Sequence, residues 1–365
     1  MIPRQLVVGP AEHGVVRYAR ELAAAVRRLA PAATATEIDL PALLLLLASE
    51  KASEPRHLHV TDRLLGQHPQ QAAALVEALA ERAPLSVTLH DLPQRSDGAR
   101  SLPRRAAAYR RVVAAARGVA VNSAHEAELL SEFVWPHRAV DAAIIPLPVI
   151  SPEGVLTAGV DAAEFTSEVG LIGFVYPGKG HREVISAVAG YCDSEGQRER
   201  ERQQGLPASG QPEGKRSTLG ITALGAASAG HEVEATELTV YARSVGTRFT
   251  LTGYLDDEEL LRRTRSVAVP IAAHQHVSAS GSVSSWLAAG RRPLVPDTRY
   301  FREMLALRPG TLTLYQPDAA GLASALAAAL RHPQSTLLGP GISTAPHLPE
   351  TAAAYLRWWA TGVRW

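Results

Sequence analysis

Residues 169–181 read VGLIGFVYPGKGH, and this stretch decides the fold. Its apolar start predicts a short strand, its glycines predict a loop, and a helix is expected to begin near Arg182. The same alternation of strand and helix extends through the sequence on both sides of it. Such alternation is typical of βαβ units on a parallel sheet.

The first half of the chain predicts one complete α/β unit, and the second half predicts another. In the first half the expected strands are 4–9, 35–40, 56–61, 85–91, 118–123 and 142–148, and the expected helices are 18–29, 70–82, 103–117 and 124–133. In the second half, strands are expected within 169–175, 217–228, 247–255, 266–272 and 292–297, with helices after 182, over 232–245, 256–265 and 319–330, and up to 289. Two such units predict a protein with two Rossmann-like domains, whose ligands bind at the carboxyl ends of the strands.

The expected domain boundaries follow from composition. Proline and glycine cluster over 146–159, which predicts a hinge, so the first domain is expected to cover residues 1–160. The second domain is expected to cover 161–345, and residues 346–365 a C-terminal helix. Residues 193–217 are polar without apolar periodicity, and we interpret them as a solvated insertion in the second domain.

Composition excludes several classes of protein. The 365 residues carry 37 Lys and Arg against 36 Asp and Glu, a formal charge of +1, so no bulk field recruits nucleic acid. The single Cys192 excludes an internal disulfide. The apolar run at 43–48 is too short to span a bilayer. The apolar run near the start of the sequence is too short for the core of a signal peptide. These features predict a cytoplasmic protein.

Three loops follow a predicted strand and open a predicted helix, where backbone N–H groups and the helix dipole favour anions. They are residues 10–15, with Gly14; residues 176–181, with Gly178, Lys179 and Gly180; and residues 278–285, rich in serine. Lys179 is one of only three lysines in the chain, the others being Lys51 and Lys215. The ordinary alternatives are a plain turn, a solvated lysine and helix-capping serines.

Six segments, in this order, carry a resemblance to a known family. They are HGVVRY (13–18), VTLHDL (87–92), VNSAHEAELL (121–130), IGFVYPGKGH (172–181), FTLTGYLDDEEL (249–260) and SGSVSSWLAAGRRPLV (280–295). Together they resemble the GT-B glycosyltransferases of the family 4 type, over most of the chain except 193–217. The resemblance implies two Rossmann-like domains facing a central cleft, with a C-terminal helix that crosses back to the first domain.

The resemblance also implies site residues. Lys179 matches the lysine that clamps the donor diphosphate, and His90 matches a histidine beside the donor sugar, so both are candidate catalytic residues. The remaining donor-binding candidates are Gly14, Gly178, Gly180, Gly253, Tyr254, Leu255, Ser280, Gly281, Ser282 and Val283. Lys179 and the helix N-termini can stabilise the charge of a departing diphosphate without a metal, so neither a cofactor nor a metal is expected.

The sequence departs from the family pattern at three positions. Phe174 stands where the family carries an arginine, and Val277 and Ser285 stand where it carries two glutamates. Substitute contacts to the donor sugar are expected from His274, Gln275, His276 or Ser278. The pair His274 and His276 lacks a clear third metal ligand, so paired surface histidines are the preferred interpretation.

The predicted helix 103–117 is locally basic. Arg104, Arg105, Arg110 and Arg111 form a candidate contact for an anionic membrane surface or an anionic acceptor. The alternative is a solvated arginine face in an arginine-rich chain.

Together with the charge of Lys179, the resemblance implies transfer of a sugar from a nucleoside-diphosphate sugar to an unidentified acceptor, retaining and metal-independent. One alternative is a non-catalytic GT-B subunit that binds a nucleotide or a partner protein. Another is a GT-B enzyme that transfers no sugar, such as an epimerase or a phosphorylase.

Overall fold

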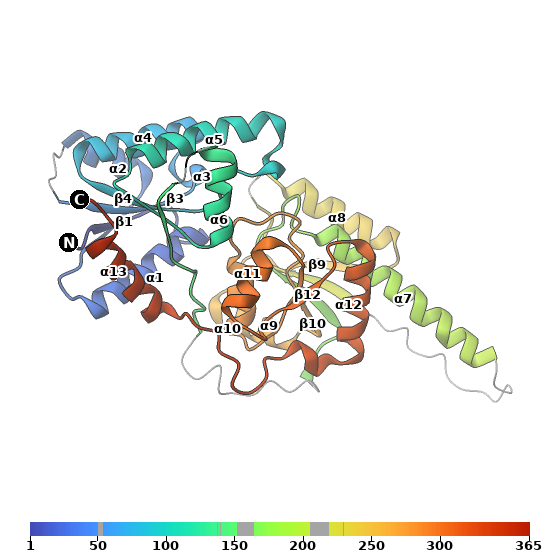
Figure 1. Cartoon of the computed structure of the whole chain (residues 1–365). Coiled ribbons are helices and arrows are strands. Elements are labelled where there is room, and N and C mark those ends of the chain that lie inside the picture. Colours follow the sequence, from blue (N-terminus) through green and yellow to red (C-terminus); the bar gives the residue numbers. More distant parts are fainter. Residues whose placement is uncertain (50–53, 137, 139, 152–163, 205–218, 229) are drawn as a thin grey trace. The chain divides into compact units, whose positions relative to one another are not determined.

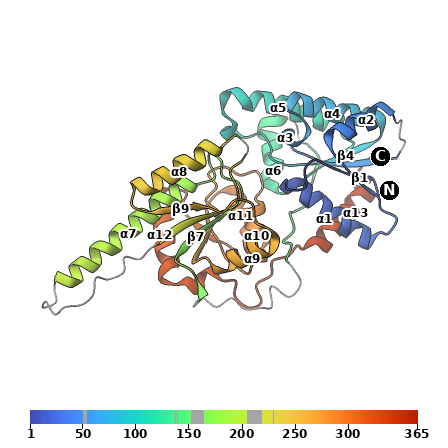
Figure 2. The same ribbon diagram turned by 180° about the vertical axis from the view of Figure 1, so that it is seen from behind.

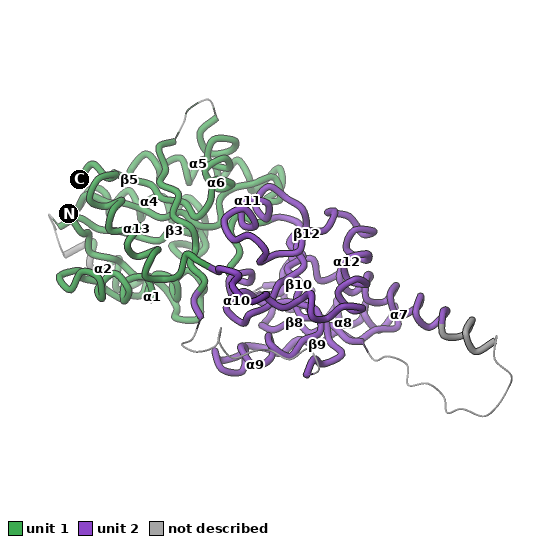
Figure 3. The backbone as a smooth tube through the Cα atoms, turned by 60° about the horizontal axis from the view of Figure 1, so that its bottom comes forward, with its two compact units in different colours: residues 1–149, 277–281, 345–365 green, residues 150–276, 282–344 purple. Residues whose placement is uncertain are grey.

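A computed structural model describes residues 1–49, 54–136, 138, 140–151, 164–204, 219–228 and 230–365 (Figure 1). The chain divides into two compact units, coloured separately in Figure 3. Unit 1 comprises Met1–Val149, Val277–Gly281 and Ala345–Trp365, and unit 2 comprises Ile150–His276 and Ser282–Thr344. The expected boundary at residue 160 and most of the expected hinge lie outside the described residues.

Unit 1 is built on a parallel sheet of six strands in the order β2-β1-β3-β4-β5-β6. The strands are β1 (Arg4–Val8), β2 (Ala35–Ile38), β3 (Arg56–Val60), β4 (Leu85–Leu89), β5 (Gly118–Val121) and β6 (Ala142–Ile144). Every residue of β3 and β4 is buried, so helices cover both faces of the central sheet. The strand order changes direction between β1 and β3, which places a topological switch point there.

Helices cover the two faces of this sheet in different ways (Figures 1 and 2). On one face, α4 (Pro69–Arg82) and α5 (Gly98–Ala115) pack on the main core, together with α2 (Leu40–Ser49). On the other face, α1 (Gly14–Leu29) packs against the C-terminal α13 (Leu348–Thr361). The short α3 (Asp62–Leu65) and α6 (Ala124–Leu129) follow β3 and β5.

The C-terminal helix α13 is part of the core of unit 1. Tyr355 and Trp359 are fully buried, and Trp358 is nearly so, in a cluster shared with Leu22 and Val26 of α1. The last helix therefore returns to the first unit, and this part of the predicted fold is confirmed.

Unit 2 is a second parallel sheet of six strands, in the order β12-β11-β10-β7-β8-β9. The strands are β7 (Glu168–Ile172), β8 (Gly220–Leu224), β9 (Arg248–Leu251), β10 (Val269–Ile271), β11 (Leu294–Pro296) and β12 (Thr313–Tyr315). Counted within the unit, this is the Rossmann order, and its switch point lies between β7 and β10. The predicted α/β class with two Rossmann-like domains is confirmed.

The helices of unit 2 include one that corrects a prediction. They are α7 (His181–Gln204), α8 (Glu232–Ser244), α9 (Asp257–Ser266), α10 (Gly281–Ala288), α11 (Arg299–Leu307) and α12 (Ala319–Arg331), with the first residue of α10 grouped in unit 1. Helix α7 continues through residues 193–204, which we predicted to be the start of an insertion without periodicity. The segment is rich in Glu, Gln and Arg, which favour helix even without an apolar face. Residues 205–217 of that insertion lie outside the described part of the chain.

Candidate functional site

The loop between β7 and α7 lies at the switch point of unit 2, and two glycines shape it. Gly178 has φ +83° and Gly180 has φ +91°, a backbone region that favours glycine. A Cβ atom on Gly180 would lie 2.1 Å from the carbonyl oxygen of Ala273, whereas one on Gly178 would meet no atom nearer than 3.9 Å. Gly180 is therefore required by both conformation and packing, and Gly178 by conformation alone.

Lys179, between these glycines, is buried with 6% of its surface exposed. Its Nζ lies 2.8 Å from Nε2 of His274, a residue that follows β10 on the other side of the switch point. Among the described residues, no carboxylate forms an ion pair with Lys179. Burial lowers the pKa of Lys179 to about 7, because no negative charge offsets the desolvation of the ammonium.

Two buried histidines accompany this lysine. Burial and the nearby Lys179 charge lower the pKa of His181 to about 3 and that of His274 well below its usual value. Both imidazoles are therefore neutral, and the amine of Lys179 donates a hydrogen bond to Nε2 of His274. The cluster can carry one positive charge, and it lacks a negative one that would stabilise it. Such a group is suited to bind an anion.

Neighbouring loops close around the same edge of the sheet. Gly225, after β8, lies so close to Gly173, after β7, that an added Cβ would be 2.4 Å from the Gly173 carbonyl oxygen. The N–H of Gly225 donates to Oγ1 of Thr252, after β9. The next residues are Gly253, with φ +76°, Tyr254, which is largely exposed, and Leu255, which is half-buried. Gly253, Tyr254 and Leu255 thus follow the strand at the far side of β8 from Lys179.

A hollow of about 380 Å³ lies beside this loop in unit 2. It is lined by Gly178 and Gly180, by the first residues of α7, and by Glu234, Glu237 and Leu238 of α8. The backbone of the glycine loop therefore borders open space, although the amine of Lys179 is buried.

The serine-rich loop is divided between the two units. Ser280 and Gly281 group with unit 1, and Ser282 and Val283 group with unit 2. The side chain of Val283 is buried in the protein with 3% exposure, so only its backbone could face a ligand. Helix α10 begins at Gly281, as the predicted strand-to-helix loop requires.

Of the substitutes expected for the missing glutamates, the three at 274–276 lie against the glycine loop of unit 2, where the N–H of Gln275 donates to the Gly178 carbonyl and His276 is the nearest neighbour of Gly178. His274 contacts Lys179, Gln275 is hydrogen-bonded to Glu183, and Ser278 lies in unit 1. Phe174 is half exposed and Val277 is buried. No cluster of three or more metal-ligand side chains occurs within the residues that the structure describes, and His274 and His276 gain no third partner there.

In unit 1, His90 directly follows β4 and is buried with 6% exposure. Its Nε2 lies 3.0 Å from Nδ1 of His59, and its Nδ1 lies 3.4 Å from the amide nitrogen of Asn122. The amide nitrogen of Asn122 also donates to the Glu126 carboxylate at 2.9 Å and to the Leu89 carbonyl at 3.2 Å, so its contact with Nδ1 of His90 is the weakest of the three. Burial lowers the pKa of His90 to about 3, so the ring is neutral. Both ring nitrogens are engaged, and a sugar hydroxyl would have to replace one of these partners.

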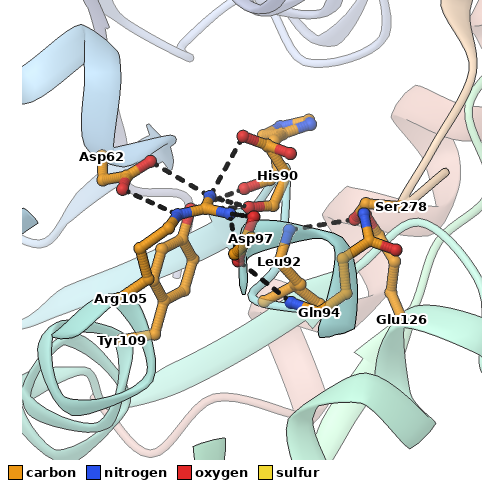
Figure 4. A network of polar contacts seen from close by, with 10 residues as sticks. Asp62, His90, Leu92, Gln94, Asp97, Arg105, Tyr109, Glu126 and Ser278 are labelled. Carbon is orange, nitrogen blue, oxygen red and sulfur yellow. Dashed lines mark hydrogen bonds and ion pairs between the residues drawn. The ribbon is translucent and has the colours of Figure 1, made fainter. Parts of the chain in front are cut away.

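The backbone around His90 is fixed by α5 (Figure 4). The hydroxyl of Tyr109 donates to the His90 carbonyl at 2.7 Å. Arg105 donates to the carboxylates of Asp62 and Asp97 and to both the carbonyl and the carboxylate of Asp91. Asp91 has φ +50°, an uncommon conformation for a residue other than glycine.

The predicted basic surface on α5 is therefore wrong at Arg105, which is buried among three carboxylates. Arg111 pairs with Glu77 at 2.6 Å, and Nε of Arg110 donates to the carbonyl of Val134. Arg104 is exposed. No helix in the described residues combines the length and apolarity that a membrane span requires.

Gly14 occupies a simpler position than expected. It is the first residue of α1, and Nδ1 of His13 accepts the N–H of Val15 to cap this helix. A Cβ on Gly14 would meet nothing within 4 Å, and its φ is not positive. The backbone therefore does not require glycine here.

Sequence reasoning overlooked the buried acid Glu126. It has no exposed surface, and burial raises its pKa to about 7. The signal was present as Ser123-x-x-Glu126, a typical helix N-terminus, in which Ser123 Oγ accepts the N–H of Glu126. The carboxylate, however, accepts from the backbone and side chain of Asn122, which no local pattern indicates.

Comparison with known proteins identifies the fold. No protein-family model and no curated protein matches the sequence. Among solved structures, Anabaena HepE in complex with UDP and glucose superimposes with a TM-score of 0.65 at 13% identity, covering 98% of this chain and 99% of that one. Sucrose-phosphate synthase from Thermosynechococcus elongatus gives 0.63 at 16% identity, covering 99% and 96%.

A third similar structure is the UDP-forming α,α-trehalose-phosphate synthase from Burkholderia xenovorans, solved with glucose-6-phosphate. It gives a TM-score of 0.55 at 13% identity, covering 86% of this chain and 74% of that one. The architecture shared with these proteins is the GT-B fold, and this chain has it over essentially its full length.

Proposed function

We propose that the protein transfers a sugar from a nucleoside-diphosphate sugar to an acceptor, with retention of configuration and without a metal. The observation that carries the proposal is the buried, uncompensated Lys179 amine beside His274, at the switch point of a Rossmann-like unit in a GT-B fold. A diphosphate would supply the missing negative charge.

The chemistry assigned to unit 2 is stabilisation of the leaving group. When the bond between sugar and diphosphate breaks, negative charge grows on the phosphate oxygens. Lys179 supplies a positive charge, and the N-terminus of the long helix α7 supplies oriented N–H groups. These contributions together replace the role of a metal ion. In a retaining reaction the acceptor attacks from the face that the diphosphate leaves.

The proposed donor is first sought among UDP-sugars. The solved structures of Anabaena HepE contain UDP, UDP with glucose, and UDP-glucose. In this chain Gly253, Tyr254 and Leu255 are proposed to border the base. Ser280, Gly281, Ser282 and Val283 are proposed to face the diphosphate, together with Gly178 and Gly180.

His90 is proposed to act at the donor sugar. For that role one of its ring contacts, to His59 or to Asn122, must give way to a sugar hydroxyl. The weaker of the two is the 3.4 Å contact with Asn122, so Nδ1 is the atom proposed to accept from the sugar.

A second candidate function is favoured by specific residues. Phe174, Val277 and Ser285 replace charged residues of the family, and Phe174 presents an apolar side chain to solvent. A GT-B subunit that binds a nucleotide without turning it over would tolerate these changes.

The experiment is a donor screen with EDTA present. UDP-, GDP-, ADP- and dTDP-sugars are incubated with the full chain, and release of the nucleoside diphosphate is measured, with Lys179→Met as the paired variant. The proposal predicts release from one donor by the native chain and at least about tenfold slower release by the variant. Binding without release supports the non-catalytic subunit, and no binding of any donor contradicts both.

A further inference from the structure

A short segment from the second half of the sequence is built into unit 1. Val277–Gly281 follows β10 and precedes most of α10, yet it groups with unit 1. Its attachment is polar. Nε2 of His125 donates to the carbonyl of Val277 at 2.8 Å, and Ser278 is 5% exposed and makes two hydrogen bonds within unit 1.

The hydrogen bonds of Ser278 have a fixed direction (Figure 4). The N–H of Leu92 donates to Oγ of Ser278 at 3.0 Å, so Oγ is an acceptor there. The same hydroxyl lies 2.5 Å from Oε1 of Glu126 and donates its hydrogen to it. Ser278 thus connects the backbone that follows His90 to a fully buried carboxylate.

Glu126 holds this chain of bonds in place. Its other oxygen accepts from the backbone N–H of Asn122 at 2.7 Å and from the amide nitrogen of Asn122 at 2.9 Å. In the described residues it forms no ion pair. The same amide nitrogen is 3.4 Å from Nδ1 of His90, so Glu126 reaches His90 through Asn122 as well as through Ser278 and Leu92.

We propose that Glu126 and Ser278 are positioning residues that fix the His90 turn and the segment 277–281 in one arrangement. The inference rests on the proposed function, because it assigns His90 to the donor sugar and the residues after Ser278 to the diphosphate. Loss of either partner leaves a buried donor or acceptor unsatisfied, and the turn at 90–92 loses one of its anchors. Misplacement of a substrate-positioning group lowers turnover more than it lowers binding.

The test is a double-mutant cycle on the full chain. Ser278→Ala, Glu126→Ala and the double variant are compared with the native protein and with Ser131→Ala. Ser131 is exposed and its hydroxyl donates to the carbonyl of Ala127, so this control removes a hydroxyl elsewhere in unit 1. Turnover and donor affinity are measured well below each melting temperature, and amide hydrogen exchange is measured on peptides covering residues 90–92.

The proposal expects kcat to fall about tenfold or more in each single variant, with donor affinity changed less than about threefold. The double variant is expected to be no slower than the slower single variant, because both substitutions remove the same arrangement. Exchange at residues 90–92 is expected to accelerate in Ser278→Ala and to stay unchanged in Ser131→Ala.

Additive losses in kcat, or native exchange at residues 90–92 in Ser278→Ala, would overturn the proposal. Exchange needs no substrate, so it decides the positioning role even if the native chain transfers no sugar. A chain that transfers no sugar but shows faster local exchange contradicts the proposed function and leaves the anchoring of the turn supported.

Discussion

The proposed binding of a diphosphate depends on the charge state of Lys179. Its pKa is lowered to about 7 in the folded protein, because burial disfavours the ammonium. Binding of a diphosphate favours the charged form, so the pKa rises on binding and a proton is taken up. The affinity for a UDP-sugar is therefore expected to fall roughly tenfold or more between pH 6.5 and 8.5. A UDP-sugar is the suitable probe because its phosphates do not titrate in this range.

This pH dependence is measured by calorimetry in two buffers of different ionisation enthalpy. The native chain is expected to show proton uptake near neutral pH, and Lys179→Met is expected to show none. An equal pH dependence in both proteins would assign the titration to another group.

Gly180 and Gly178 form a matched pair for testing the loop. Gly180→Ala places a Cβ 2.1 Å from a backbone oxygen, whereas the Cβ of Gly178→Ala would have its nearest neighbour, a carbon of His276, at 3.9 Å, and both require an unfavourable positive φ. Gly178→Ala is expected to cost about 1 kcal/mol of stability. Gly180→Ala is expected to cost clearly more and to abolish nucleotide binding. Thermal unfolding and calorimetry of the two variants check this, and equal effects would show that the close contact does not determine the loop.

Among single residues, the sequence indicated those whose role shows in their immediate sequence neighbours. The glycines around Lys179 and the scarcity of lysine both indicated an unusual cation. Glu126 and Ser278 could not be paired in this way, because 152 positions separate them and only the fold brings them together. For the same reason, nothing in the sequence showed that Arg105 is surrounded by Asp62, Asp91 and Asp97.

Helix α13 contributes large aromatic side chains to the core of unit 1. Trp359 is fully buried against the sheet and α1, so Trp359→Ala removes a large apolar contact. It is expected to lower the stability of unit 1 by about 3–5 kcal/mol. Arg357→Ala, on the exposed side of the same helix, is the control and is expected to change stability by less than about 0.5 kcal/mol.

Tryptophan fluorescence in urea measures this effect, because four of the five tryptophans lie in unit 1. If Trp359→Ala and Arg357→Ala unfold at the same urea concentration, α13 is not part of the core of unit 1.

Buried histidines on β3 and after β4 make the stability of unit 1 sensitive to acid. Burial lowers the pKa of His57 and of His90 to about 3. In the unfolded chain these rings protonate near pH 6.5, so the unfolded state binds more protons below that pH. The free energy of unfolding is therefore expected to fall as pH decreases from about 6.5 toward 3, by about 1.4 kcal/mol per histidine per pH unit.

His57→Gln is the variant for this prediction, since it removes one titrating ring from a site that is fully buried between Ser86 and Thr88. Between pH 6 and 4, the slope of the unfolding free energy against pH is expected to decrease by about 1.4 kcal/mol per pH unit, which corresponds to one proton fewer taken up on unfolding. An unchanged slope would mean that His57 already protonates in the folded state.

Elements were predictable where periodicity or turn chemistry was clear. All six expected strands of the first half occur within a few residues of their predicted ends. Helix α2 was not predicted because LPALLLLLAS is apolar on every side and has no helical period. Strand β12 was not predicted, although β6, β10 and β11 are equally short and were. Helix α7 extends through a polar segment that helix propensity favours.

The whole molecule consists of two Rossmann-like units with different strand orders. The alternation of strands and helices predicted both units, because hydrophobic patterning survives when sequence identity has fallen to 13–16%. The strand orders could not be predicted, since the same alternation suits both the order of unit 1 and that of unit 2. Nor does patterning show that residues 277–281 belong to unit 1, because that depends on buried polar contacts.

The central claim is that Lys179 holds the diphosphate of a nucleotide sugar. The direct measurement is calorimetric titration of UDP and uridine into the native chain, Lys179→Met and Lys215→Met, the last of which removes the same charge elsewhere in the sequence. Lys179→Met is expected to weaken UDP binding about 10- to 100-fold, the range expected for loss of a charged hydrogen bond. Its affinity for uridine, and the affinity of Lys215→Met for UDP, are expected to stay within about twofold of the native values. Equal weakening of UDP and uridine, or native UDP affinity in Lys179→Met, would contradict the claim.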